Sequence, residues 1–312
     1  MTLSVFIDGA EGTTGLEIRE RLAPRGEFSL IALPDDKRKD AVARREALND
    51  CDVAILCLPD DAAREAVSFI ENDRTKVIDA STAHRVADGW TYGFPELVGE
   101  DTVRQAKRIS NPGCYPTGFL AMVAPLVSSG LLPADWPYTV NAVSGYSGGG
   151  KALIRRFEEN TNVAWRGYGL GMGHKHLGEM QHYAGLTHPP LFAPAVVDAH
   201  RGMVVEVPVP LSAMGAKVAA NDLHGALSAF YAGSKIVGVA DMDDSPGELL
   251  MRKNVQPWDG LTIHIFKNEG GSQVRLIATL DNLGKGASGA AVQSLNLISG
   301  LAAATGLNLP AQ

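Results

Sequence analysis

The chain has 312 residues, of which 45% are hydrophobic and 20% are charged. This apolar content is enough for two hydrophobic cores, so we expect two domains. The formal net charge is −7, and no basic stripe appears that could neutralise the phosphates of a duplex. These features exclude a nucleic-acid-binding protein and favour a protein that acts on a small molecule.

The beginning of the chain and its cysteines predict a cytoplasmic location. Residues 1–7 lead directly into a glycine turn, without the charged segment and long apolar stretch of a secretory signal. No apolar run is long enough to span a bilayer, so we expect no membrane partner. Cys51, Cys57 and Cys114 stand at unrelated spacings, which is typical neither of a disulfide framework nor of a Cys-x-x-Cys metal site.

The first third of the chain alternates predicted strands with predicted helices. A strand at 3–7 ends at a glycine turn and is followed by a helix at 16–22. The pattern continues with strands at 28–33, 52–58 and 76–79 and helices at 40–49 and 62–71. This alternation predicts an α/β fold with a doubly wound, parallel sheet of the Rossmann type.

The rest of the chain predicts a second domain of the α+β class. Strand-like segments at 138–143, 203–209, 261–266 and 274–279 alternate well enough to predict a mostly antiparallel sheet with one covered face. Residues 287–304 are small and apolar and predict a buried helix that returns to the first domain. We therefore expect a dinucleotide-binding domain formed by residues 1–113 and about 286–312, and a catalytic, substrate-binding and oligomerisation domain formed by residues 114–285.

Three glycines mark the first strand-to-helix junction. Gly9, Gly12 and Gly15 have the spacing Gly-x-x-Gly-x-x-Gly, and backbone amides at such a junction can hold a pyrophosphate. Glycines also simply close tight loops, so the spacing alone is a weak signal. Its place at the first junction favours a dinucleotide site.

The segment after the second strand bears on the choice between NAD and NADP. An NAD enzyme usually has an acidic residue there, whereas an NADP enzyme has cations. Residues 34–39 contain both acidic and basic side chains. The basic ones weakly favour NADP(H), with Arg38 as the partner of the 2′-phosphate. A solvated charged loop is the alternative.

Cys114 is the candidate nucleophile. It follows the turn Asn111-Pro112-Gly113 and precedes an apolar helical segment, so we expect it at a helix amino terminus. The positive end of a helix dipole favours the thiolate there. A small buried residue in a turn is the alternative. Cys57, inside the apolar run 53–58, is predicted to be an inert buried thiol, and Cys51 has no evident partner.

Two histidines are the candidate proton donors. His174 and His176 flank Lys175, and Glu179 follows three residues later. Imidazole titrates near neutral pH and could protonate an aldehyde oxygen or activate a thiol. Metal binding is the rival interpretation, but a His-x-His pair without a third ligand at fixed spacing is weak support for it.

The order of these segments resembles the N-acetyl-gamma-glutamyl-phosphate reductase family of arginine biosynthesis, in its shorter form. The resemblance covers nearly the whole chain. It depends on the segments 6–15, 55–62, 92–96, 111–117, 144–148, 174–176 and 281–289. Residues 148–151 and 198–201 depart from the expected pattern, which puts the substrate contacts in doubt more than the chemistry.

The resemblance implies an NADPH-dependent reductase that turns N-acetyl-L-glutamyl 5-phosphate into the semialdehyde through a thioester on Cys114. His176 or His174 would be the acid–base residue, with a slight preference for His176. The expected cofactor-binding residues are Gly9, Gly12, Thr13, Thr14, Gly15, Arg38, Pro59, Ser81 and Asn282, and Asn282 would lie near the nicotinamide. The expected substrate-binding residues are Asn111, Ser144, Ser147, Gly148, Lys151, Glu179 and Arg201. Ser144, Ser147 and Gly148 belong to a glycine-rich loop suited to phosphate, and Lys151 and Arg201 are candidate cations.

We further expect a homo-oligomer, either a dimer or a tetramer. Two alternatives to this function remain open. One is an aspartate-semialdehyde dehydrogenase, which shares the fold plan and the thioester chemistry. The other is a non-catalytic, dinucleotide-binding sensor.

Overall fold

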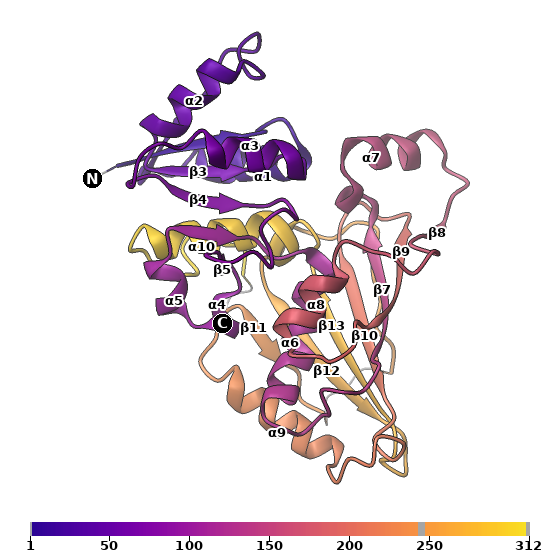
Figure 1. Ribbon diagram of the computed structural model, residues 1–312. Coiled ribbons are helices and arrows are strands. Elements are labelled where there is room, and N and C mark those ends of the chain that lie inside the picture. Colours follow the sequence, from indigo (N-terminus) through magenta and orange to yellow (C-terminus); the bar gives the residue numbers. More distant parts are fainter. Residues whose placement is uncertain (1, 243–246, 310–312) are drawn as a thin grey trace. The chain divides into compact units, whose positions relative to one another are not determined.

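The computed structural model describes residues 2–242 and 247–309 of the chain. Its described residues divide into two compact units (Figure 1): residues 2–113 with Ala287–Leu307, and those of Cys114–Gly286 with residues 308–309. Asn308 groups with the second unit because its backbone N–H donates to Asp259 Oδ2 at 2.7 Å and its carbonyl accepts from Asp259 N at 2.9 Å. Over the described ranges, no helix has the length and apolar character needed to cross a membrane.

The first unit contains a parallel sheet, as predicted. Over the residues described, this sheet has six strands in the order β2-β1-β3-β4-β6-β5, and neighbouring strands run parallel. In the register of β1 with its two neighbours, Val5 pairs with Leu30 of β2 and with Val53 of β3. The strands are β1 (Leu3–Asp8), β2 (Phe28–Ile31), β3 (Val53–Leu56), β4 (Lys76–Asp79), β5 (Thr91–Tyr92) and β6 (Arg108–Ser110).

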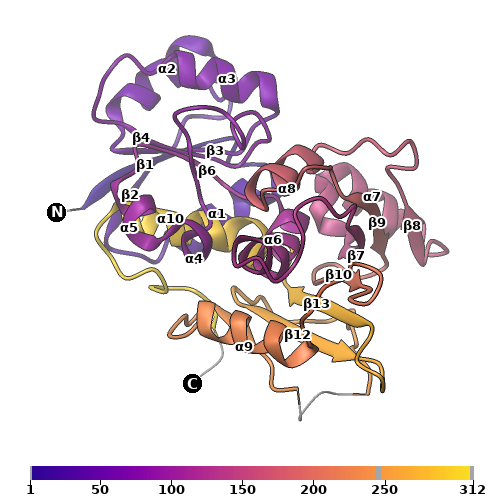
Figure 2. The ribbon, with the colours of Figure 1, turned by 60° about the horizontal axis from the view of Figure 1, so that its bottom comes forward.

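Helices cover both faces of this sheet. Figure 2 shows α2 (Ala41–Asp50) and α3 (Asp60–Ser68) on one face, and α1 (Thr13–Leu22) and α10 (Gly289–Ile298) on the other. The short helices α4 (Pro95–Val98) and α5 (Glu100–Gln105) follow β5, and α5 packs against α10. Leu48, Leu56 and Ala63 belong to a core layer that α2 and α3 form with the strands.

The second unit contains a mixed and mostly antiparallel sheet. Its described strands lie in the order β11-β12-β13-β10-β7-β9-β8, and only the β11–β12 and β7–β9 pairs among them are parallel. Side chains of β10 alternate between buried and half-buried, as expected for one covered face. The strands are β7 (Thr139–Gly145), β8 (Trp165–Gly167), β9 (Leu191–Val197), β10 (Met203–Val209), β11 (Val237–Val239), β12 (Leu261–Lys267) and β13 (Val274–Leu280).

The covered face of this sheet carries the long helix α6 (Cys114–Ser128), which packs on β10 and β13. Gly118 allows the close approach, since a Cβ there would lie 2.7 Å from Val205 Cγ2. Further helices are α7 (Gly150–Glu159), α8 (Leu177–Tyr183) and α9 (Ala220–Phe230), and α8 and α9 both pack against α6. The 3-10 turn η1 (Tyr146–Gly149) follows β7, and the π-helical turn η2 (Gly284–Ser288) precedes α10.

Several element ends differ from the sequence prediction, and three of them are the C-terminal ends of β2, β3 and the last helix. β2 stops at Ile31 and β3 at Leu56, because pairing with β1 ends at Phe6–Ile31 and Asp8–Leu56. The last helix ends at Ile298 instead of continuing to residue 304, since the chain turns at Gly300 with a φ of 79° that favours glycine. The first two differences leave residues 32–33 and 57–58 to line a cavity.

Candidate active site

The glycine turn between β1 and α1 is fixed by close backbone packing. Gly9 has a φ of 86°, and a Cβ there would lie 2.4 Å from the carbonyl oxygen of Cys57. A Cβ on Gly15 would lie 2.4 Å from the carbonyl oxygen of Gly9. Both distances are far below van der Waals contact, so these two positions require glycine.

The start of α1 leaves hydrogen-bonding groups available to a ligand. Its N-cap residue is Gly12, and no side chain caps the helix. Thr13 Oγ1 is buried without a hydrogen-bond partner in the described structure. A Cβ on Gly12 would lie 3.3 Å from the carbonyl oxygen of Gly9, so the surrounding protein restricts this position much less than Gly9 or Gly15. A helix amino terminus of this kind suits the pyrophosphate of a dinucleotide.

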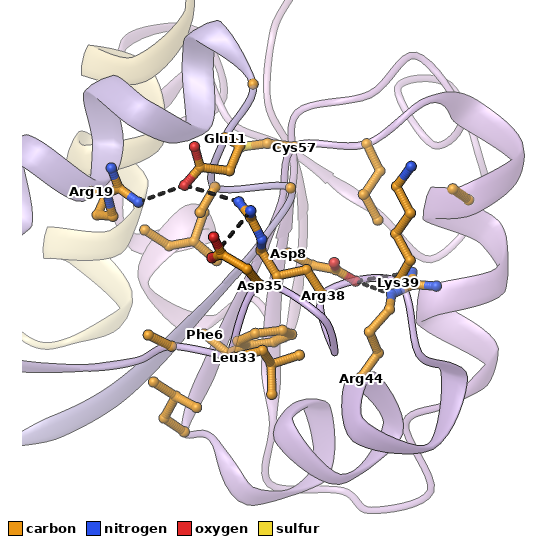
Figure 3. Close-up of a pocket in the computed structure, with 18 of the residues that line it drawn as sticks. Phe6, Asp8, Glu11, Arg19, Leu33, Asp35, Arg38, Lys39, Arg44 and Cys57 are labelled. Carbon is orange, nitrogen blue, oxygen red and sulfur yellow. Dashed lines mark hydrogen bonds and ion pairs between the residues drawn. The ribbon is translucent and has the colours of Figure 1, made fainter.

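A cavity of about 850 Å³ opens beside this turn. Figure 3 shows residues of β1, the glycine turn and the β2–α2 connection around it. Its volume is that of a small-molecule or cofactor site. Predicted cofactor residues in the lining are Gly9, Gly12, Arg38 and Pro59.

Two buried charges, which the sequence analysis missed, face each other in this cavity. Asp8 Oδ2 accepts hydrogen bonds from Arg44 Nε and Nη2, both at 3.0 Å, and Arg44 Nη1 donates to Glu65 at 2.9 Å. Burial raises the pKa of Asp8, although the hydrogen bonds and charge of Arg44 act in the opposite direction. The pair joins the end of β1 to α2, so it fixes the residue immediately before the glycine turn. An acidic residue at the end of an apolar strand is the signal that could have indicated a buried partner.

The other predicted cofactor residues lie in different places. Thr14 and Gly15 follow Thr13 in the first turn of α1. Ser81 is buried beyond β4, where its Oγ donates to Asp79 Oδ2 at 2.7 Å. Asn282 belongs to the second unit.

The three cysteines have different surroundings, and none forms a disulfide. Burial raises the pKa of Cys51 to about 12. Cys57 lies just beyond β3 and is half-buried in the cavity wall, not inside the strand as predicted. Its pKa is also raised to about 12, first by burial and then by the charges of Asp79 and Asp8. Both thiols are therefore protonated at neutral pH, which makes them poor nucleophiles.

Cys114 is the first residue of α6, as the sequence predicted. The helix is 15 residues long and buried along most of its length. Gly286 packs directly against the cysteine, since a Cβ on Gly286 would lie 2.9 Å from Cys114 Cβ. The amino end of a helix stabilises a thiolate, so the fold provides the environment of a nucleophilic cysteine.

The predicted histidines gather around Tyr115, the neighbour of Cys114. The Tyr115 ring centroid lies 6.3 Å from that of His174 and 5.9 Å from that of His176. The two imidazoles are 4.7 Å apart, and Tyr168 lies 5.6 Å from His174. Cys114, the two histidines and the two tyrosines thus form one group, which we call the cysteine cluster.

Charge and burial connect the tyrosines to the thiol. Burial raises the pKa of Tyr168, and a negative charge on Cys114 raises it further against the opposing hydrogen bond of Tyr115. Burial likewise raises the pKa of Tyr115, whose hydroxyl donates to the carbonyl of Ala195 at 3.0 Å. Both phenols therefore stay protonated at neutral pH. Neither tyrosine was predicted as a site residue, because no motif in the sequence distinguishes Tyr115 or Tyr168 from other buried aromatics.

The histidines differ in how they are held. His174 Nδ1 accepts the backbone N–H of His176 at 3.2 Å, whereas His176 is buried and precedes α8 directly. Protonation of His174 at Nδ1 would break that hydrogen bond. Among the residues described, no group of three His, Cys, Asp or Glu side chains is placed to hold a metal ion.

The predicted phosphate loop lies at the end of β7. Asn282 Nδ2 donates to Ser147 Oγ at 2.9 Å, and its Oδ1 accepts the N–H of Gly202 at 2.9 Å. A Cβ on Gly148 would lie 3.4 Å from Asn282 Nδ2 and 3.4 Å from Ser144 Oγ. The structure therefore brings Ser144, Ser147, Gly148 and Asn282 together.

The remaining predicted substrate residues are dispersed. Arg201 Nη1 pairs with Asp281 Oδ2 at 2.9 Å, beside Asn282 in the sequence. Lys151 is exposed on α7, and Glu179 is buried on α8. Asn111 belongs to the first unit, where its Nδ2 donates to the carbonyl of Ala287 at 3.0 Å and its Oδ1 is buried without a partner among the described residues.

Family models match both units. Residues 4–106 match the NAD-binding domain of semialdehyde dehydrogenases, and residues 114–282 match their dimerisation domain. Among solved structures, aspartate semialdehyde dehydrogenase II of Vibrio cholerae superposes with a TM-score of 0.69 over 96% of this chain and 98% of that one, at 16% identity. This likeness shows a shared fold.

Relatives at much higher identity share one name. The N-acetyl-gamma-glutamyl-phosphate reductase of Trichormus variabilis is 48% identical over 97% of this chain and 98% of its own length. The enzyme of the same name from Burkholderia ambifaria is 48% identical over 96% of this chain and 97% of its own length. With its nicotinamide-dinucleotide domain and its cysteine cluster, this chain belongs to the N-acetyl-gamma-glutamyl-phosphate reductase family of oxidoreductases.

Proposed function

We propose that this chain reduces N-acetyl-L-glutamyl 5-phosphate to N-acetyl-L-glutamate 5-semialdehyde, with release of phosphate and NADPH as the hydride donor, in arginine biosynthesis. The observation that carries the proposal is Cys114 at the first residue of α6, grouped with His174, His176 and two protonated tyrosines. The near-full-length identity to reductases of this name supports the choice of substrate.

The proposed reaction starts at the Cys114 sulfur. The thiolate attacks the acyl carbon, the bond from that carbon to the phosphate oxygen breaks, and phosphate leaves a thioester on the enzyme. When bound, a reduced nicotinamide dinucleotide would supply the hydride for reduction of this thioester. An imidazole would protonate the resulting oxyanion to give a thiohemiacetal. The same imidazole would take this proton back as the carbon–sulfur bond breaks, which releases the aldehyde and the Cys114 thiolate.

We assign the proton transfer to His176. His174 Nδ1 already accepts the N–H of His176, so a proton there would cost a hydrogen bond. His174 would then orient the segment that carries His176. The protonated Tyr115 and Tyr168 add hydrogen-bonding and apolar surface that helps to exclude water near the thiol.

For the substrate we propose one phosphate-binding loop and four further contacts. The loop with Ser144, Ser147 and Gly148 would hold the phosphate, with Asn282 fixing the loop through Ser147. Arg201, Lys151, Glu179 and Asn111 stay proposed substrate contacts; the unpaired Oδ1 of Asn111 is a buried acceptor that a ligand could satisfy.

The dinucleotide would lie in the cavity of the first unit, with its pyrophosphate at Gly12, Thr13 and Thr14. The orphaned Thr13 Oγ1 and the uncapped start of α1 fit this group. We propose NADP(H) over NAD(H) because Arg38 lines the cavity beyond β2. Pro59 lies in the same wall, and Ser81 and Asn282 stay proposed contacts.

We also propose a homo-oligomer and a cytoplasmic location. The second unit matches a family model described as a dimerisation domain, and Trp165, Leu170 and Met172 expose apolar side chains there. Three cysteines outside any disulfide fit a reducing compartment.

An assay with two acyl phosphates tests the function. Purified protein is given NADPH with either N-acetyl-γ-glutamyl phosphate or β-aspartyl phosphate, and NADPH oxidation is followed. We expect turnover of the acetylated substrate only. Turnover of aspartyl phosphate instead would identify an aspartate-semialdehyde dehydrogenase, and NADPH binding without turnover of either substrate would favour the sensor.

A further inference from the structure

The side chain of Glu11 lies between Arg19 and Arg38 in the lining of the proposed dinucleotide cavity (Figure 3). Glu11 Oε1 is 2.7 Å from Arg19 Nη1 and 3.2 Å from Arg38 Nη1. The three residues come from the glycine turn, α1 and the β2–α2 connection. One carboxylate oxygen is thus shared by two guanidinium groups from separate elements.

This arrangement is the kind that binds phosphate. Guanidinium groups bind phosphate and carboxylate oxygens with the same planar donor geometry. Arg38 also pairs with Asp35, whose Oδ1 lies 3.1 Å from Arg38 Nη2. Glu11 therefore occupies a position between cations that a phosphate oxygen could take.

The ion pairs that hold Glu11 are exposed enough to be exchanged. The side chains of Arg19, Arg38 and Glu11 are 43%, 38% and 48% exposed. Ion pairs of this exposure contribute at most about 1 kcal/mol, so a dianion can replace the carboxylate at low cost. By contrast, the Asp8–Arg44 pair of the same cavity is buried and is expected to persist.

The charges near this point cancel without a ligand. Besides the Asp8–Arg44 pair, the cavity lining holds the cations Arg19, Arg38 and Lys39 and the anions Glu11, Asp35 and Asp36. A cavity with cancelled charge attracts a dianionic phosphate less strongly than one with an excess of cations. The resident carboxylates therefore lower the affinity that the arginines alone would give.

We propose that Arg19 and Arg38 together form the site for the 2′-phosphate of an adenine dinucleotide, and that Glu11 is a resident anion that this phosphate displaces. Glu11 thereby limits the preference of the chain for a 2′-phosphorylated nucleotide over its unphosphorylated form. The inference depends on the proposed dinucleotide site, but it concerns selectivity and not the reduction itself.

Binding of two nucleotide fragments tests this inference. Adenosine 2′,5′-bisphosphate and adenosine 5′-monophosphate differ only in the 2′-phosphate, and calorimetric titration of each gives a preference ratio. Glu11→Gln should raise this ratio about tenfold, since it removes one anion and leaves the arginines in place. Arg19→Gln and Arg38→Gln should each lower it about tenfold.

A matched variant controls for net charge. Glu46→Gln removes the same charge from the exposed face of α2, away from the cavity lining, and should leave the ratio unchanged. A ratio that is unchanged or lower in Glu11→Gln would overturn the role of Glu11. An unchanged ratio in Arg19→Gln would overturn the two-arginine site.

The fragments separate this inference from the proposed function. Neither carries a nicotinamide, so the ratio is independent of any turnover of acyl phosphate. A protein that shows the expected ratios yet fails to reduce the acetylated substrate would contradict the proposed reaction and retain the phosphate site.

Discussion

The cavity of the first unit and the cysteine cluster of the second are assembled in different ways. All lining residues of the cavity come from between Phe6 and Ala62, and the glycine turn beside it is held by close backbone packing at Gly9 and Gly15. The cysteine cluster joins Cys114 to side chains some 50 to 60 positions later, at Tyr168, His174 and His176. A local sequence pattern can encode the first kind of site, whereas the second requires a completed fold.

The largest effect is expected from Cys114→Ser, which should impair the reaction at the cysteine cluster and leave cofactor binding in the cavity intact. Cys114→Ser should lower kcat/KM for the acetylated acyl phosphate by roughly 1,000-fold or more, because a serine hydroxyl is a far weaker nucleophile than a thiolate. The Kd for NADPH should stay near its wild-type value, since the cavity that we propose as its binding site is lined by residues between Phe6 and Ala62. Steady-state kinetics and calorimetry measure the two quantities.

Cys51→Ala is the matched control for that variant. Cys51 is a fully buried thiol outside the cavity and the cysteine cluster, so its loss should affect stability only slightly and leave turnover intact. Rapid reduction by Cys114→Ser would contradict the thioester mechanism.

Thiol labelling compares the cysteines directly. At pH 8 a thiol with a pKa near 12 is almost wholly protonated, so Cys51 and Cys57 should react with iodoacetamide roughly 1,000 times more slowly than an ordinary exposed thiol. Their labelling should accelerate as the pH rises toward 12, because the thiolate is the reactive form. Peptide mass spectrometry should find Cys114 modified first.

Unfolded protein is the control for labelling, since all three thiols should then react at similar rates. Labelling of Cys57 in the folded protein as fast as that of Cys114 would show that the cavity wall does not suppress its ionisation.

The two histidines should differ in effect. His176→Asn should lower kcat about 100-fold and remove one limb of the pH–rate profile, because it removes the proposed proton donor. His174→Asn should lower kcat less, since an asparagine Oδ1 can replace Nδ1 as the acceptor of the His176 N–H. If neither variant changed the profile, the acid–base assignment would be wrong. A changed profile in His174→Asn alone would reverse the two roles.

The sequence predicted the parallel sheet, the glycine turn and the position of Cys114 because each depends on a short pattern. Apolar runs separated by helical spacing define the strands, and the Pro-Gly-Cys turn ahead of an apolar segment defines a helix start. These signals do not depend on distant residues.

The buried Asp8–Arg44 pair and the place of Tyr168 could not be predicted in this way. Arg44 has the spacing of an ordinary charged residue on a helix, and only the packing of α2 against β1 turns it toward Asp8. Likewise, the half-buried place of Cys57 depends on where pairing with β1 stops, and a continuous apolar run conceals that boundary. Long-range packing decides each of these features.

The smallest effect is expected on the free energy of unfolding, when Gly15 and Gly12 of the same turn are each replaced by alanine. Gly15→Ala gains about 1 kcal/mol of helix propensity, but its Cβ would lie 2.4 Å from the Gly9 carbonyl oxygen and 2.9 Å from Ala10 Cα. Backbone atoms cannot move aside as a flexible side chain can, so overpacking of about 1–3 kcal/mol should exceed the gain. We expect a lower free energy of unfolding for this variant, measured by urea denaturation.

Gly12→Ala is its counterpart, because the nearest protein atom to a new Cβ would be the Gly9 oxygen at 3.3 Å. Its stability should change by about 1 kcal/mol or less, whereas its affinity for NADPH should fall if the pyrophosphate lies over this residue. Stable protein with weakened NADPH binding in Gly12→Ala, beside destabilised protein in Gly15→Ala, would show that one glycine serves the ligand and the other the fold. Unaltered NADPH binding in Gly12→Ala would place the pyrophosphate elsewhere, because a methyl group at that point could not then be in its path.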